Sequence, residues 1–320
     1  MKAIYYMSHG GADVLQIGEL PIPPIAEDEV LVQVAATSVN PIDRRLRSGE
    51  LQEYITRTFP VVPGWDFSGR VVAVGDAVSN YEIGDDVVGL AFTWSIQYGT
   101  YAQYAPIKAT SLTKKPKNIS FEQAAALPLV SLTAWQSLSE FGQLQAGQSV
   151  LIHAGAGGLG SVAIPLAKYL GAKVYTTASS RNREYVESVG ADVVIDYREQ
   201  DYASVIRELE PQGLDLILQS LLDDQASKDS ISLVRDGGAV AYMNNEPPEM
   251  PEIKERNVRA EFLHHRPDGE SLTELLRLFS NGTLPVPRVQ LMELEQAVEA
   301  HQLSEEGHTI GKLVLKIQNL

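Results

Sequence analysis

The sequence contains no cysteine among its 320 residues. This absence excludes disulfide bonds, thiolate nucleophiles, iron–sulfur clusters and every zinc site that needs a cysteine ligand. The longest apolar runs fall short of the ~18 residues that a membrane-spanning helix requires. The N-terminus leads into polar, glycine-rich sequence and lacks the apolar stretch of a signal peptide. A soluble, cytoplasmic protein is therefore expected.

Cationic residues are scarce. Lysine and arginine total 26 against 41 aspartate and glutamate residues, which gives a formal net charge of −15. Such a surface repels phosphate backbones, so sequence-independent binding of nucleic acid is not expected. An anionic cofactor would need a local site of backbone N–H groups and a few cations. At about 100–200 residues per domain, the length predicts about two domains.

The first third of the chain carries β-branched runs separated by glycine-containing turns. These runs predict strands over residues 30–34, 70–74, 87–90 and 100–104. Short strands at this spacing are typical of a compact, partly closed β-domain. Near residue 120 the pattern changes, and a helix is predicted to begin after Ser120.

From residue 150 onward, strand and helix signals alternate. The predicted strands cover residues 150–152, 173–177, 193–195, 214–218 and 239–242. The predicted helices include residues up to about 170 and residues 182–189, and two more lie near 272–279 and 293–302, before a last strand over 312–316. Apolar strands separated by helices indicate an α/β fold with a parallel, doubly wound sheet.

The strongest chemical signal is the glycine loop that follows the first of these strands. It holds the pattern G-x-G-x-x-G as Gly155, Gly157 and Gly160, with Gly158 and Leu159 inside it. Because the loop follows a buried strand and opens a helix, it has the context of a dinucleotide-binding site. The glycines allow a tight turn, a close approach to the pyrophosphate and close packing of helix on strand. The helix N-terminus offers unpaired N–H groups to the anion.

The residues after the next strand favour NADP(H) over NAD(H). NAD sites usually carry an acidic residue about 20 residues beyond the loop, to bind the ribose 2′-hydroxyl. No aspartate or glutamate lies between Gly155 and Arg183. The segment holds Ser179, Ser180 and Arg181, whose hydroxyls and guanidinium suit a 2′-phosphate. The alternative is that the serines only cap the next helix and that Arg181 is solvated.

Several motifs together give the chain a wider resemblance. They are residues 38–43 (SVNPID), 63–69 (PGWDFSG), 84–87 (GDDV), the glycine loop and 195–199 (IDYRE). With them the chain resembles, over its whole length, the zinc-independent medium-chain dehydrogenase/reductase superfamily and, within it, the NADPH-dependent quinone oxidoreductases. The resemblance implies a GroES-like, β-rich catalytic domain of residues 1–120 and 265–320, and a Rossmann NADP-binding domain of residues 121–264.

The resemblance also bears on metal binding. Zinc-dependent relatives carry a cysteine near the position of Asn40 and a His-Glu pair where this chain has Trp65 and Asp66. The pair His264 and His265 has no metal-binding spacing around it, so no metal is expected. Without a metal to polarise an oxygen, alcohol dehydrogenation is disfavoured. The expected reaction is therefore hydride transfer from NADPH to a quinone or an α,β-unsaturated carbonyl compound.

The same resemblance implies site residues. Asn40 and Asp43 would lie beside the nicotinamide and its ribose as catalytic residues, and Tyr197 near the adenine end. Many relatives have a tyrosine two residues after an Arg-Ser-Gly motif, but here Leu51 stands there. Tyr54 is the candidate substitute, with a core or surface tyrosine as the alternative, and water could supply the proton for quinones. The other implied cofactor contacts are Thr133, Met243, Asn244, Asn245, Phe262, Leu263 and Lys312.

The expected partners are a bulky hydrophobic quinone or enone and a second copy of the chain. The resemblance implies a homodimer through edge strands of the cofactor domain, near residues 239–243 and 259–263. Two alternatives stay open: an enoyl-thioester reductase, and a non-catalytic NADPH-binding protein of the same fold, since cofactor binding survives the loss of chemistry.

Overall fold

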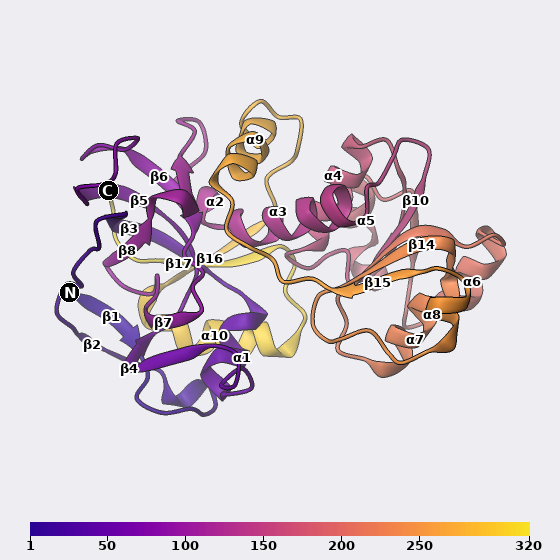
Figure 1. Cartoon of the computed structure of the whole chain (residues 1–320), viewed down its shortest axis with the longest axis horizontal. Coiled ribbons are helices and arrows are strands. Elements are labelled where there is room, and N and C mark those ends of the chain that lie inside the picture. Colours follow the sequence, from indigo (N-terminus) through magenta and orange to yellow (C-terminus); the bar gives the residue numbers. More distant parts are fainter. The chain divides into compact units, whose positions relative to one another are not determined.

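The computed structural model describes the whole chain, Met1–Leu320. The chain divides into two units, each with its own sheet (Figure 1). Unit 1 comprises Met1–Leu132, Arg266–Gly282 and Val286–Leu320, and unit 2 comprises Thr133–His265 with Thr283–Pro285. The domain limits given above, at residues 120 and 264, stay a prediction. None of the helices is both long enough and apolar enough to span a membrane.

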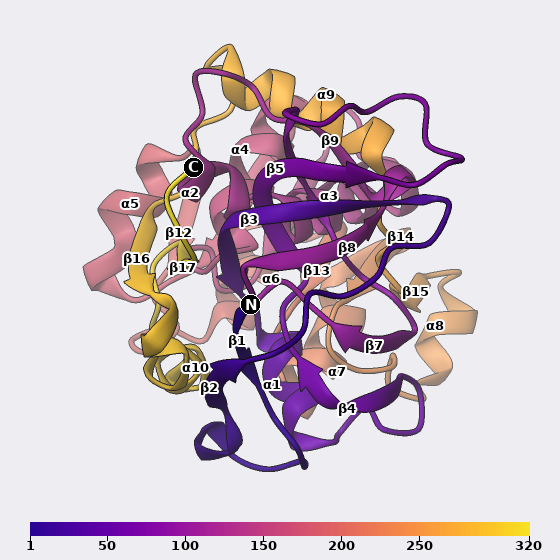
Figure 2. The same cartoon turned by 90° about the vertical axis from the view of Figure 1, so that its left-hand side faces the viewer.

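Unit 1 is built on a seven-stranded sheet. Its strands are β3 (Glu29–Val39), β5 (Asp66–Val74), β6 (Asp86–Leu90), β8 (Tyr104–Lys108), β9 (Leu112–Lys114), β16 (Val289–Glu293) and β17 (Lys312–Lys316). They follow the order β16-β17-β3-β5-β6-β9, and β8 also pairs with β3. Every pair is antiparallel except β16 with β17. Figure 2 shows β3 lying between β5 and β8.

The core of this sheet follows from the alternation along β3. Successive side chains of a strand point to opposite faces, and Val30, Val32 and Val34 are all buried on the same face. They belong to one apolar cluster with Phe67 of β5 and Val87 of β6. The β-branched residues that predict these strands thus also supply the core of the unit.

The strand predictions for unit 1 are correct except at one place. Those within β3, β5 and β6 are confirmed. The strand predicted over residues 100–104 is wrong for residues 100–103, since β8 begins at Tyr104. Upstream of it the Tyr101 N–H donates to Pro63 O at 3.0 Å. The aromatic and β-branched residues of this segment are buried without forming a regular ladder.

Two small sheets and several helices complete unit 1. The sheets pair β1 (Lys2–Tyr5) with β2 (Gln16–Glu19) and β4 (Thr56–Val62) with β7 (Ser95–Tyr98). The helices are α1 (Pro41–Ser48), α2 (Phe121–Ala125), α9 (Gly269–Ser280) and α10 (Ala297–Glu306). The predicted start of α2 is confirmed, because the Gln123 N–H donates to Ser120 Oγ at 3.2 Å. Helix α3 (Pro128–Trp135) runs from unit 1 into unit 2 and continues as a π-helical turn over Gln136–Phe141.

Helix α1 is absent from the sequence predictions, although its ends carry clear signals. Pro41 occupies its first turn, where the missing N–H costs nothing. The Asn40 N–H donates to Asp43 Oδ2 at 2.9 Å, as in a capping box. At the other end Gly49 adopts a left-handed conformation with φ 89°. These end signals hold Asn40 and Asp43 next to each other.

Unit 2 contains the predicted parallel sheet. Its strands are β10 (Ser149–Ile152), β11 (Lys173–Thr177), β12 (Val193–Ile195), β13 (Leu214–Gln219), β14 (Val234–Tyr242) and β15 (Arg259–Phe262). The order is β12-β11-β10-β13-β14-β15, and every pair is parallel. The helices are α4 (Gly160–Tyr169), α5 (Arg183–Ser188), α6 (Tyr202–Leu209), α7 (Asp224–Leu233) and α8 (Pro251–Glu255). The predicted α/β class with a doubly wound sheet is confirmed.

The strand order locates a ligand-binding edge in unit 2. The chain moves from β10 to β11 and β12, then returns to the other side of β10 with β13. In such sheets ligands bind beyond the carboxyl ends of the strands where the order reverses. That point lies after Ile152 of β10 and Gln219 of β13. The same order corrects one expectation: β14 lies between β13 and β15, so of the two strands expected at the edge only β15 is an edge strand.

Candidate active site

The glycine loop occupies the ligand-binding edge of unit 2, between β10 and α4. Its backbone is closed by bonds from Gly155 N to Thr177 O (3.0 Å) and from Gly157 N to Ala154 O (2.9 Å). A Cβ atom on Gly160 would lie 2.5 Å from Gly155 Cα, and one on Gly155 would collide with Thr176 Oγ1. These two glycines therefore permit the helix to pack directly on the turn, as the motif predicts.

Three successive backbone amides at the start of α4 have no acceptor in the chain. The N–H groups of Gly158, Leu159 and Gly160 make no hydrogen bond, whereas the next amide, Ser161 N, donates to Gly157 O at 2.9 Å. Helix α4 has ten residues, and its N-terminus carries a partial positive charge. Unpaired amides at a helix N-terminus are the donors that a pyrophosphate uses. This geometry fits a dinucleotide.

The segment that follows β11 lies at the same edge of the sheet. Ser179 is buried but its side chain makes no capping hydrogen bond, so the helix-cap alternative has no support in the structure. Arg181 is exposed and makes no hydrogen bond or ion pair within the chain. Its guanidinium is available to a phosphate.

An acidic residue from the end of another strand lies beside this segment. Asp196, directly after β12, accepts hydrogen bonds from Ser180 N (2.7 Å) and Arg198 N (3.0 Å). The Arg198 amide and other donors lower the pKa of this carboxyl. Because both oxygens already accept backbone bonds, Asp196 is a support of the loop and a poor partner for a ribose hydroxyl. Tyr197, the next residue, is half exposed.

The other predicted cofactor residues of unit 2 follow the last strands of the sheet. Asn244 Nδ2 donates to Ser220 O at 2.6 Å, which ties the segment after β14 to the segment after β13. Leu263 N donates to Tyr242 O at 3.0 Å, just beyond β15. Met243, Asn245 and Phe262 occupy the adjoining positions, and Thr133 is buried in α3. Since all six strands are parallel, the segments after them share one edge of the sheet.

Unit 1 contains a cluster of buried polar side chains around Asp66, the first residue of β5. Its Oδ2 atom accepts from Ser38 Oγ (2.5 Å) and Asn40 Nδ2 (2.9 Å), and Oδ1 accepts from Leu129 N (2.7 Å). Lys312 Nζ lies 3.6 Å from Asp66 Oδ2 and also donates to Asn40 Oδ1. All of these side chains are buried. Asp66 thus holds together two predicted site residues, Asn40 and Lys312, that lie far apart in the sequence.

Asp43 adds a second carboxyl to this cluster. Its Oδ2 atom accepts from Asn40 N (2.9 Å) and Tyr101 OH (3.3 Å), while its buried Oδ1 atom has no partner. Burial raises the pKa of Asp43 to about 7, against the lowering effect of the bond from Asn40. Burial also lowers the pKa of Lys312, against the charges of Asp66 and Asp43. The cluster contains ionisable groups whose charge is costly, which is common at functional sites.

Replacing Asp43 by Asn is expected to change how stability depends on pH. Burial raises the folded-state pKa of Asp43 from 3.8 to about 7, so the folded chain holds this proton more tightly than the unfolded chain. The stability that this proton binding contributes is fully present below the unfolded-state pKa and is lost as pH rises through the folded-state pKa. The Asp43→Asn variant has no such proton to lose, so its stability relative to the wild type should increase by about 2–4 kcal/mol on going from roughly pH 4 to pH 8. Urea unfolding of both proteins at the two pH values measures this change; a stability difference that is the same at both pH values would contradict it.

The third predicted catalytic residue, Tyr54, lies apart from this cluster. Its side chain is 70% exposed. It belongs to a turn after α1 in which Tyr54 N and Ile55 N both donate to Leu51 O (3.1 and 2.9 Å). Leu51 itself is half-buried. The structure thus brings Asn40, Asp43 and Lys312 together but leaves Tyr54 at the surface, so its catalytic role stays a prediction.

Sequence reasoning missed three residues of these sites. Asp66 and Tyr101 complete the buried cluster of unit 1. His153 follows β10 directly, where burial lowers its pKa to about 4 and its Nε2 atom has no partner. Asp66 could have been selected, since it stands in the motif of residues 63–69 where zinc-dependent relatives carry an acid. Nothing in the sequence singles out Tyr101 or His153.

The family comparisons agree with this architecture. Residues 26–117 match the alcohol dehydrogenase GroES-like domain, and residues 189–315 match a family described as zinc-binding dehydrogenase. Within the chain, no group of three or more His, Cys, Asp or Glu side chains is arranged to hold a metal ion.

Individual relatives extend over nearly the whole chain. The NADPH-dependent alkenal/one oxidoreductase of Arabidopsis thaliana chloroplasts is 34% identical over 98% of this chain and 79% of its own length. The quinone oxidoreductase of Coxiella burnetii has a TM-score of 0.89 with 34% identity, covering 99% of both chains. The quinone oxidoreductase of Escherichia coli, solved with NADPH, has a TM-score of 0.89 with 28% identity, covering 99% of this chain and 100% of its own. The chain belongs to the zinc-independent medium-chain dehydrogenases/reductases, in the family of the quinone oxidoreductases.

Proposed function

We propose that the chain is an NADPH-dependent reductase of quinones and α,β-unsaturated carbonyl compounds that works without a metal. The observation that carries this proposal is the shared sheet edge of unit 2, where three unpaired amides at the N-terminus of α4 lie at the same edge as Ser179 and Arg181. The acceptor class is supported by the relatives named quinone oxidoreductase and alkenal/one oxidoreductase.

Different segments of unit 2 would bind different parts of the cofactor. The amides of Gly158, Leu159 and Gly160 would bind the pyrophosphate, and Ser179, Ser180 and Arg181 the 2′-phosphate. Tyr197 would lie along the adenine. Segments 243–245 and 262–263, with Thr133, would flank the nicotinamide. When bound, NADPH supplies the hydride; the protein supplies orientation and hydrogen bonds.

The buried cluster of unit 1 fixes the orientation of the Asn40 amide. Lys312 donates to its Oδ1 atom, and its Nδ2 atom donates to Asp66 (2.9 Å). An amide nitrogen carries two hydrogens, so one remains for the nicotinamide or its ribose. The backbone N–H of Asn40 donates to Asp43 Oδ2 at 2.9 Å. Asn40 is therefore a preorganised donor, and Asp66, Lys312 and Asp43 position it.

The function is tested by the loss of NADPH absorbance with three acceptors supplied separately: phenanthrenequinone, an open-chain alkyl enone and crotonyl thioester. Turnover with the quinone and the enone is expected. Turnover with the thioester alone would favour the enoyl-thioester reductase. Tight NADPH binding without turnover of any acceptor would favour the non-catalytic binding protein.

A chelator is expected to leave the rate unchanged, and the purified active protein should hold no stoichiometric zinc. The reason is the ligand set: the chain has no cysteine, and Asn40, Trp65 and Asp66 stand at the family's zinc-ligand positions. Elemental analysis and a rate assay after dialysis against chelator measure both. One tightly held zinc per chain, with activity lost on its removal, would overturn the metal-free mechanism.

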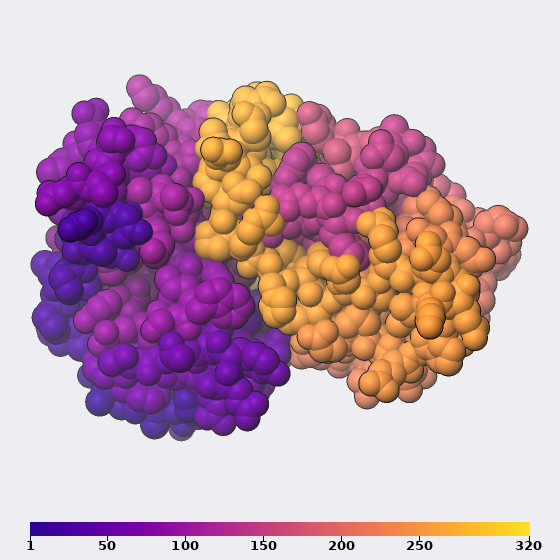
Figure 3. Space-filling view, in the orientation of Figure 1, coloured from indigo at the N-terminus to yellow at the C-terminus, as the bar shows by residue number.

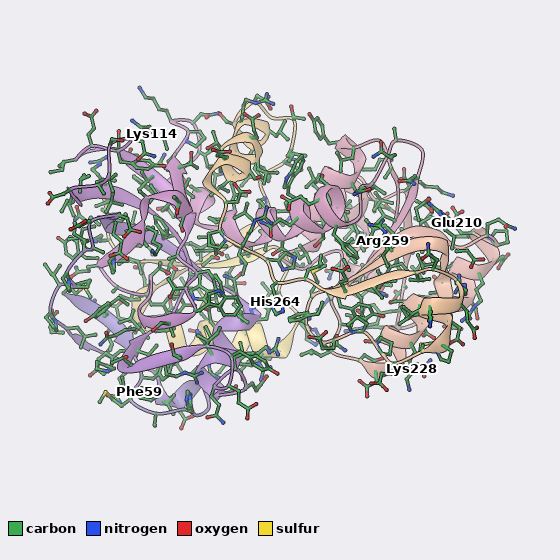
Figure 4. All side chains as sticks on the ribbon, viewed as in Figure 1. Phe59, Lys114, Glu210, Lys228, Arg259 and His264 are labelled. Atoms are coloured by element: carbon green, nitrogen blue, oxygen red, sulfur yellow. The ribbon has the colours of Figure 1, made fainter.

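We also propose that two copies pair through β15. This strand forms the edge of the parallel sheet, and an unpaired edge invites pairing with a second copy. Arg259, labelled in Figure 4, lies at its start, and the orange part of the chain that includes β15 reaches the surface in Figure 3. Light scattering should give the mass of two chains; a monomer at micromolar concentration would contradict it. A cytoplasmic location is a separate part of the proposed function; the Arabidopsis relative is named as chloroplastic.

A further inference from the structure

Three aromatic rings of unit 1 form a continuous series from the interior to the surface. The rings of Trp65 and Phe92 meet edge to face, with centroids 4.8 Å apart at 86°. Those of Phe92 and Trp94 meet in the same way, 4.9 Å apart at 79°. Trp65 is 4% exposed and Trp94 is 56% exposed. We call these three residues the aromatic ladder.

The inner end of the ladder carries a hydrogen-bond donor without an acceptor. Trp65 Nε1 is buried and has no partner, whereas buried indole N–H groups usually find one. An orphaned buried donor costs about 1–3 kcal/mol. A ligand with a carbonyl oxygen at this place would remove that cost.

The backbone around Trp65 is fixed by a hydrogen bond and by close packing. Trp65 O accepts from Ala91 N at 2.7 Å. The preceding Gly64 has φ +95°, and a Cβ atom there would collide with the ring of Tyr101. The following residue is Asp66, whose carboxylate orders Asn40 and Lys312. The inner end of the ladder is thus one residue from the buried cluster.

The outer end of the ladder is also supported by unit 1. Trp94 O accepts from Thr56 N at 3.0 Å, and Thr56 pairs with Ser95 where β4 and β7 begin. Tyr54 lies two residues before Thr56 and is exposed. The surface end of the ladder therefore presents exposed aromatic side chains from two segments at the same end of this small sheet.

We propose that the aromatic ladder is the subsite for the carbonyl acceptor, with Trp65 Nε1 donating to the carbonyl oxygen and Phe92 and Trp94 contacting a planar ring. This inference rests on the proposed function and gives it a substrate class. Flat aromatic quinones gain both the hydrogen bond and the ring contacts. Open-chain enones gain the hydrogen bond alone, so quinones are the preferred acceptors.

Two substitutions separate the two contributions. Trp65→Phe keeps a ring and removes the N–H group, and should lower kcat/KM about tenfold for both phenanthrenequinone and an alkyl enone. Trp94→Ala should lower kcat/KM about fivefold for the quinone and leave the enone within about twofold. The NADPH dissociation constant should not change in either variant. Trp135→Phe is the matched control, because Trp135 lies in α3 outside the ladder.

Binding of the quinone can be measured without turnover, so the subsite and the catalytic function can be tested independently. The chain has three tryptophans, so phenanthrenequinone bound on the ladder should quench the emission of Trp65 and Trp94. The Trp65→Phe/Trp94→Phe double variant, which retains Trp135, should lose the saturable part of this quenching. Unchanged quenching and unchanged kinetics in these variants, with wild-type turnover intact, would overturn the subsite and leave the proposed function standing. Saturable quenching without any turnover would support the subsite and contradict the function.

Discussion

Asp66→Asn is expected to lower the free energy of unfolding by about 3–5 kcal/mol, the usual cost of removing one partner of a buried ion pair. The substitution leaves the buried Lys312 ammonium without its carboxylate, 3.6 Å away in the wild type. The other nearby acid is Asp43, whose pKa is raised to about 7 and which is therefore a poor replacement. The new amide group would also face donors on both sides, because Leu129 N and Asn40 Nδ2 both point at the carboxylate.

A surface ion pair provides the matched control. Arg70 Nε and Asp86 Oδ1 lie 2.8 Å apart with both side chains more than one-third exposed. Asp86→Asn should cost at most about 1 kcal/mol. Urea unfolding of both variants measures the contrast. If Asp66→Asn costs no more than Asp86→Asn, the Asp66 cluster does not hold Asn40 and Lys312 in place.

Arg181→Ala is expected to weaken NADPH binding by about 1.5–3 kcal/mol, which is the range of a charge-assisted hydrogen bond. This corresponds to roughly a 10- to 150-fold higher dissociation constant. The reason is that the exposed Arg181 guanidinium has no partner within the chain, and Arg181 follows the buried Ser179 by two residues. NADH lacks the 2′-phosphate, so its binding should be nearly unchanged.

Arg207→Ala is the control for this change, because Arg207 is an exposed arginine of the same unit that bonds to Ser232 Oγ (3.3 Å). Its removal should alter neither cofactor's affinity. Titration of each variant with NADPH and with NADH gives the four dissociation constants. An equal loss for both cofactors would mean that Arg181 supports the loop and does not select the phosphate.

The fold of unit 2 could be predicted closely because its strands are short apolar runs separated by regular helices. The predicted strands at 173–177 and 193–195 coincide with β11 and β12. Unit 1 was harder to predict, because its smaller strands bury little. In β2 three of the four residues are exposed, and in β4 the exposed and buried residues do not alternate, so neither strand carries the pattern on which strand prediction depends. Helix α1 carries three arginines among eight residues, which obscures its apolar face.

The site could be predicted where the chemistry is local and not where it depends on tertiary contacts. The glycine loop and the segment at Ser179 each consist of neighbouring residues, so the sequence alone can place them after their strands; their cofactor contacts stay a prediction. Lys312 and Asn40 are 272 residues apart, and only the pairing of β17 with β3 brings them together. Tyr101 reaches Asp43 across 58 residues from a segment without regular structure. Contacts between residues so far apart in the sequence leave no local sequence motif from which they could be predicted.

Transfer of deuterium from NADPH labelled at nicotinamide C4 tests the central claim most directly. The chain should consume the cofactor in the presence of a chelator and reduce an open-chain enone to the saturated ketone. One of the two C4-labelled diastereomers should place its deuterium on the β-carbon of that ketone, as direct hydride transfer requires. An unlabelled ketone from both diastereomers, or labelled product that forms only when zinc is present, would contradict the account.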